Sequence, residues 1–152
     1  MELADSYDAI RGSIVAFIPR MFDAKPDGSA PEIPPIIGTG YILDSDGIVA
    51  TNDHVVREFA RFKAPPGEPA DAIPVVAMLF KRIDRGVVEL PLEVLGVFRI
   101  VEFKPGQIYY GPKKPDIAFV HVKARGLQTV KIDGSTSVRE GMEVATAGFP
   151  MG

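Results

Sequence analysis

Cysteine is absent from this 152-residue sequence, and histidine occurs only twice. Without cysteine the chain can form no disulfide, hold no zinc through thiolates and use no cysteine nucleophile. No apolar run approaches the ~20 residues that a membrane span requires. The first ten residues, MELADSYDAI, contain neither the basic nor the apolar region of a secretory signal. We therefore expect stability from packing, in either a cytosolic protein or an exported one whose leader is not part of these residues.

Basic residues are also fewer than acidic ones. Seventeen Lys and Arg stand against twenty Asp and Glu, which leaves a net charge of −3, and no run of basic residues offers a cationic stripe for phosphates. Nucleic acid is therefore not an expected partner. With 46% apolar and 24% charged residues, the chain has the composition of one soluble globular domain.

Short runs rich in β-branched and aromatic residues recur along the chain, separated by Gly, Pro and Asp. This spacing predicts an antiparallel all-β domain. One segment, Ser6 to Arg11, is expected to be a short helix that leads into the first strand. The expected strands are Ser13–Ile18, Ile37–Leu43, Gly47–Thr51, Val75–Phe80, Val87–Val97, Ile100–Phe103, Ile117–Val122 and Glu143–Ala147.

Proline and glycine gather between these runs, mainly in Lys25–Pro35 and Ala64–Pro74, which we expect to be surface loops. The stretch DSDG, at 44–47, has the chemistry of a tight turn, because Asp and Ser bond back to nearby amides and Gly accepts a positive φ. A calcium loop is disfavoured there, since Ile48 stands at a ligand position and no glutamate stands where one would be needed. The sequence thus predicts a hairpin.

His54 follows this hairpin, next to Asn52 and Asp53. A histidine that acts as a general base needs a rigid mount, one nitrogen that accepts a proton, and a carboxylate that holds the other nitrogen. The end of the expected strand Gly47–Thr51 provides the rigid mount for His54. Asp116, at the start of the apolar run IAFVHV, is a candidate carboxylate, and a buried surrounding there would strengthen its bond to the ring. From the residues alone, a turn role for Asp116 is the commoner explanation.

Three stretches resemble motifs of the HtrA-like, trypsin-type serine peptidases. GTGYILDSDGIVATNDHVV, at 38–56, resembles the family's catalytic-histidine pattern G-[ST]-G-[FY]-I-[IL]-D-x-x-G-x-[IV]-x-T-N-x-H-V-V. DIAFV, at 116–120, resembles D-[IL]-A-[LVF]-[LIV], and GMEVATAGFPMG, at 141–152, resembles G-x-x-V-x-x-x-G-x-P-x-G. The motifs occur in the family's order and together span most of the chain. The resemblance implies that His54 is the general base and Asp116 its orienting carboxylate.

The resemblance also implies a fold of two six-stranded antiparallel Greek-key barrels with the active site between them. On that pattern residues 1–12 form a lead-in, 13–122 the first barrel, 123–139 the linker, and 140–152 the first strand of an incomplete second barrel. The family's nucleophile lies in G-[ND]-S-G-G-P, and this sequence has no such segment. Ser135 and Ser137 lie in DGSTS, which precedes GFPMG and lacks a following glycine, so we expect a loop there.

Two further features fall outside the motifs. The stretch from His54 to Asp116 is longer than the family usually needs, and its loop with Tyr109 and Tyr110 could contact substrate or a neighbouring domain, although packing on an edge strand is the favoured explanation. His121 lies inside IAFVHV on the face that carries Phe119. We interpret it as structural, because no further metal ligands are evident around it.

The leading hypothesis is a serine endopeptidase, represented by its histidine- and aspartate-bearing half and inactive as this chain alone. It would cleave peptides or unfolded proteins through an acyl-enzyme, needs no metal or organic cofactor by resemblance, and could form oligomers through segments outside these residues. The alternative is a non-catalytic trypsin-like module that binds peptide or scaffolds a complex. A β-barrel binding domain unrelated to peptidases would require three accidental motif matches.

Overall fold

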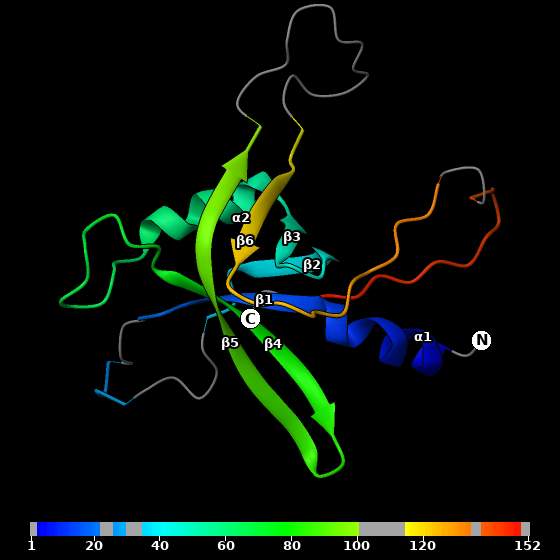
Figure 1. Ribbon diagram of the computed structural model, residues 1–152, viewed down its shortest axis with the longest axis horizontal. Helices are drawn as coiled ribbons and strands as arrows, with labels where there is room; N and C mark the ends of the chain where they lie inside the picture. Colours follow the sequence, from blue (N-terminus) through cyan, green and yellow to red (C-terminus); the bar gives the residue numbers. More distant parts are fainter. Residues whose placement is uncertain (1–2, 22–25, 30–34, 101–114, 135–137, 150–152) are drawn as a thin grey trace, which may run out of the picture.

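Six antiparallel strands close into a barrel in a computed structural model that describes residues 3–21, 26–29, 35–100, 115–134 and 138–149 (Figure 1). The order around the barrel is β1-β2-β3-β6-β5-β4, so β3 pairs with β6 and not with β4, as in a Greek key. The elements are α1 (Leu3–Ile10), the 3-10 turn η1 (Arg11–Ser13), β1 (Ile14–Pro19), β2 (Gly38–Asp44), β3 (Ile48–Thr51), α2 (Asp53–Glu58), the 3-10 turn η2 (Phe59–Arg61), β4 (Val75–Ile83), β5 (Gly86–Arg99) and β6 (Ala118–Val122).

Six of the predicted strands are confirmed, and so is the helix that leads into β1. The predicted strand Ile100–Phe103 lies mostly outside the described residues. The predicted strand Glu143–Ala147 is wrong, because these residues form no strand. A strand is stable only when its amides and carbonyls pair with a neighbour, and the sequence pattern cannot supply that neighbour.

The barrel interior is filled by alternate residues of the strands. In β6, Ala118, Val120 and Val122 are fully buried, while the residues between them are only half-buried. β1 is buried along its whole length. The ring of Phe17 from β1 packs against Phe59 of η2 with 5.3 Å between centroids, so the helical segment after β3 belongs to the same core. This packing fixes α2 on one end of the barrel.

The hairpin between β2 and β3 has the predicted turn. The Gly47 amide donates to the Asp44 carbonyl, and the Asp46 amide donates to the Asp44 side chain at 2.8 Å. Gly47 has a φ of +105°, which favours glycine. Its backbone also meets β6, because the Val122 amide donates to the Gly47 carbonyl at 2.9 Å. The turn therefore ties the β2–β3 hairpin to β6.

The segment 147–149 lies against the outer face of β2 through side chains of that strand. The Phe149 amide donates to Thr39 Oγ1 at 2.8 Å, and the Tyr41 hydroxyl donates to the Ala147 carbonyl at 2.5 Å. The Phe149 ring packs against Phe80 of β4 with 5.3 Å between centroids. Side-chain contacts thus hold residues 147–149, at the end of the predicted strand Glu143–Ala147, against β2.

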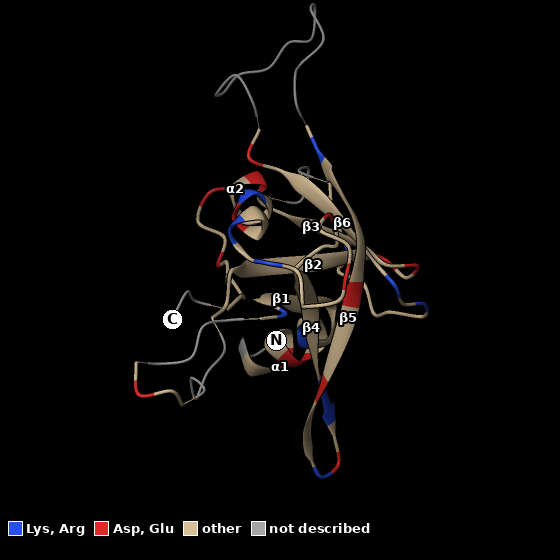
Figure 2. Cartoon of the chain, turned by 90° about the vertical axis from the view of Figure 1, so that its left-hand side faces the viewer, with Lys and Arg blue, Asp and Glu red and all other residues tan. Residues whose placement is uncertain are grey.

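The surface mixes both signs of charge, and Figure 2 shows Lys and Arg interspersed with Asp and Glu over the described chain. The residues between η2 and β4 form a loop, as predicted for Ala64–Pro74, and it projects to one side of the barrel (Figure 1). Arg20 Nη1 at the end of β1 donates to Glu68 Oε2 in that loop at 2.6 Å. Among the described residues, no helix is long and apolar enough to cross a membrane.

Candidate functional site

The site lies where the chain leaves β3 and turns into α2. Thr51, the last residue of β3, is buried, and its hydroxyl donates to the Thr39 carbonyl of β2 at 2.7 Å. Gly38 lets α2 approach β2 closely, because a Cβ there would lie 2.6 Å from both methyl groups of Val55. The backbone before and after His54 is therefore fixed by packing on the barrel.

The structure brings His54 and Asp116 together. His54 Nδ1 lies 2.5 Å from Asp116 Oδ2, and the His54 amide donates to Asp116 Oδ1 at 2.8 Å. His54 is the second residue of α2, and the first amides of a helix have no partner within the helix. The Asp116 carboxylate therefore caps this helix from the segment before β6 while it also holds the imidazole ring.

Asn52 adds a third connection between the same two segments. It is the residue before α2, and its side chain makes no capping bond to the helix. Its Nδ2 donates instead to the backbone carbonyl of Asp116 at 3.0 Å. The sequence pattern contains this asparagine, but only the fold reveals that it fixes the position of Asp116. An asparagine two residues before the histidine is the signal that could have suggested such a role.

The expectation that Asp116 is buried was wrong, since 48% of its side chain is exposed, as is 59% of the His54 side chain. The reason is that β6 begins only at Ala118, so Asp116 lies outside the ladder at the barrel rim. Two hydrogen bonds from His54, first that of the amide and then that of the ring, lower the pKa of Asp116 below its usual range. The carboxylate therefore remains ionised at neutral pH.

This geometry sets what the pair can do chemically. An ionised carboxylate that accepts from Nδ1–H holds the neutral ring in the tautomer whose Nε2 is unprotonated. The Nε2 atom can then accept a proton from a neighbouring group, and the carboxylate stabilises the resulting imidazolium. The exposure of His54 leaves room for such a group. The pair is thus suited to general base catalysis.

His121, the other histidine singled out in the sequence, does not join this pair. His121 is half-buried in β6, on the side of the strand that carries Phe119, in agreement with the alternation. Tyr109, Tyr110, Ser135 and Ser137 lie outside the described residues. Within the described part of the chain, no group of three or more His, Cys, Asp and Glu side chains could hold a metal ion.

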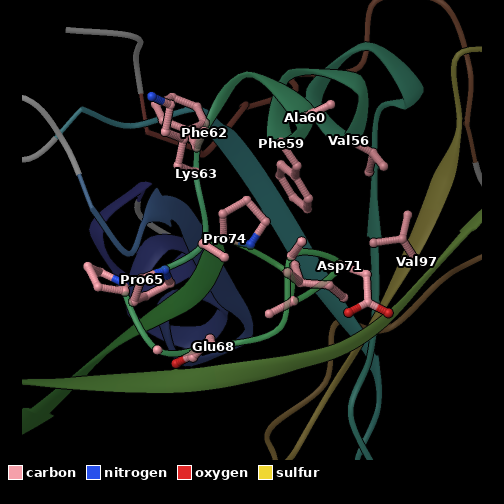
Figure 3. A pocket seen from close by; sticks show the side chains of 16 residues that line it. Val56, Phe59, Ala60, Phe62, Lys63, Pro65, Glu68, Asp71, Pro74 and Val97 are labelled. Carbon is pink, nitrogen blue, oxygen red and sulfur yellow. The ribbon is translucent and has the colours of Figure 1, made fainter.

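A pocket of about 750 Å³ lies on another side of α2, between η2 and the loop before β4. In Figure 3, Val56, Phe59 and Val97 stand on one side of it, and Lys63 and Pro65 on the other. Neither His54 nor Asp116 lines it. The pocket and the histidine–aspartate pair are therefore separate features of the same helical segment.

Comparisons with known proteins give a family and relatives. Residues 38–152 match the model of the trypsin-like peptidase domain. Two relatives, from Ectopseudomonas mendocina (strain ymp) and Pseudomonas fulva (strain 12-X), are described as probable periplasmic serine endoproteases, DegP-like. Each is 28% identical to this chain over 116 residues, which make up 76% of this chain and 18% of the relative. The chain thus spans less than a fifth of the length of these relatives.

A solved structure of similar shape is that of the HtrA-type protease AlgW with a decapeptide. Its TM-score is 0.47 at 14% sequence identity, over 93% of this chain and 38% of that one.

Proposed function

This chain belongs to the trypsin-like peptidase domain family, and from that premise we propose that it supplies the general base and the orienting carboxylate of a serine endopeptidase. The observation that carries the proposal is the double contact of one carboxylate with the amide and the ring of one histidine. His54 is the base and Asp116 the orienting group. A carboxylate that capped the helix alone would have no need to reach the ring.

In the proposed mechanism, a serine Oγ attacks the carbonyl of the scissile peptide bond while His54 Nε2 takes its proton. The imidazolium then returns this proton to the leaving amine, and the acyl-enzyme forms. Asp116 stabilises the imidazolium, because its charge and its hydrogen bond both favour the protonated ring. A water molecule then attacks the acyl-enzyme in the same way, with His54 as the base, and releases the acid product. The substrates are peptides or unfolded proteins.

The nucleophile of this reaction lies outside the 152 residues, because the sequence contains no G-[ND]-S-G-G-P segment. We divide the chain accordingly into a lead-in (1–12), a first barrel (13–122), a linker (123–139) and the start of a second barrel (140–152). The serine would then face His54 from the second barrel.

A fluorophosphonate probe, which labels activated serines, tests the proposal. We expect no labelling of the 152-residue chain, and labelling of one serine in the longest natural protein that contains it. The same protein should hydrolyse a casein substrate. A labelled serine within these 152 residues would contradict the division, and a long protein without labelling or hydrolysis would favour the non-catalytic peptide-binding module.

A further inference from the structure

Asp53, the residue directly before His54, is held by an arginine of a distant strand. Arg99 Nε donates to Asp53 Oδ1 at 2.6 Å, and Arg99 Nη2 donates to Asp53 Oδ2 at 3.0 Å. Arg57, one helical turn after Asp53, adds a contact from its Nε to Oδ2 at 3.3 Å. Only 16% of the Asp53 side chain is exposed. The carboxylate is thus largely enclosed by two guanidinium groups.

This pair differs from an ordinary surface ion pair. Isolated exposed pairs contribute little, because holding two long side chains in place offsets a weak attraction. A two-point guanidinium–carboxylate contact fixes orientation as well as distance, and it requires Arg and not Lys. Here the contact joins residues 46 positions apart in the sequence. It can therefore restrain one element relative to another.

The position of Arg99 shows which elements are joined. Arg99 is the last residue of β5 and pairs with Ala118 of β6, two residues after Asp116. The first turn of α2 is therefore tied at two points, through Asp53 to Arg99 at the end of β5 and through His54 to Asp116, two residues before β6. His54 directly follows the residue that Arg99 holds.

We propose that Arg99 is a positioning residue, which acts through Asp53 to hold the first turn of α2 so that His54 meets Asp116 with both its amide and its ring. Arg99 has a second effect on the pair. The charge of Asp53 raises the pKa of Asp116, in opposition to the hydrogen bonds from His54. The guanidinium of Arg99 partly offsets the charge of Asp53.

Amide hydrogen exchange on this chain tests the proposal without any turnover. The amide of His54 exchanges only when its bond to Asp116 opens, so it reports directly on the position of the helix. With R99Q we expect this amide to exchange about tenfold faster, while amides of the β3–β6 ladder keep their rates. The low-field proton resonance of the His54 ring bonded to Asp116 should broaden or disappear in the same variant.

Four further variants make the result decisive. R99K should protect the His54 amide better than R99Q does, since lysine keeps the positive charge but cannot make the two-point contact. D53N should accelerate exchange at least as much as R99Q, because it also removes the contact with Arg57, and the double variant should add little to D53N. The control is R61Q, since Arg61 makes a local, exposed pair with Glu58 at 2.9 Å in the same helical segment. It should leave the exchange of the His54 amide unchanged.

The proposal is overturned if R99Q leaves the His54 amide within about twofold of the wild-type rate. It is also overturned if R61Q accelerates exchange equally, or if R99Q accelerates the ladder amides as much as that of His54. A role of the Arg99 contact in catalysis rests on the proposed function, whereas the result of the exchange experiment does not depend on that function. A failed exchange test would leave the proposed function standing, and a failed probe experiment would leave the exchange result standing.

Discussion

The replacement of His54 by alanine is expected to lower kcat for peptide hydrolysis by about four to six orders of magnitude, in the protein that joins these residues to the nucleophile. Without the imidazole, the group proposed to take the proton of the serine is lost. The free energy of unfolding should change little, because 59% of the His54 side chain is exposed and its amide remains bonded to Asp116. Steady-state kinetics with a fluorogenic peptide, beside urea unfolding, measure both quantities.

The chain contains its own control for this experiment. His121 is the other histidine, and it lies in β6, away from α2. The H121Q variant should retain kcat within about twofold, because His121 has no part in the proposed mechanism. Activity retained by H54A, or lost equally in H121Q, would contradict the assignment of the general base.

The G47A variant is expected to lose about 4 kcal/mol of unfolding free energy, from two effects of similar size. First, the φ of +105° is unfavourable for any residue with a Cβ atom. Second, that Cβ would lie 2.3 Å from the carbonyl oxygen of Val122, and backbone atoms cannot move aside as a flexible side chain can. The clash also threatens the hydrogen bond from the Val122 amide to Gly47. Urea unfolding followed by circular dichroism measures the loss.

Gly86 allows the two effects to be separated. It also lies at a hairpin, between β4 and β5, with a φ of +136°, but a Cβ there would meet nothing within 4 Å. The G86A variant should therefore lose only about 2 kcal/mol, from backbone strain alone. Equal losses in the two variants would show that close contact with β6 does not explain the glycine at position 47.

The sequence was most informative where structure depends on neighbouring residues. The turn around Asp46 and Gly47 was predicted because its hydrogen bonds lie within four residues, and β6 was predicted because its alternation is local. The strand expected at Glu143–Ala147 was wrong, because its formation depends on a partner that the pattern does not contain. The same limit applies to Asp116, whose exposure depends on where the ladder of β6 begins.

In the candidate site, too, local motifs could be predicted and contacts between distant residues could not. His54 and Asp116 were predicted from motifs, and the fold brings them within hydrogen-bonding distance. The helix that carries His54 was not predicted, since its six residues are stabilised by packing of Val55, Val56 and Phe59 on the barrel. The contact of Arg99 with Asp53 could not be predicted either, because it joins two charged residues far apart in the sequence.

The tautomer of His54 tests the central claim most directly, because the proposed role requires Nε2 to be free to accept a proton. Long-range proton–nitrogen correlation spectra of this chain, recorded with the ring neutral, distinguish the two nitrogens. We expect the proton on Nδ1 in the wild type, and its loss from that position in D116N but not in D46N, where an exposed turn carboxylate is replaced. A wild-type ring protonated on Nε2, or a Nδ1 proton that persists in D116N, would contradict the account.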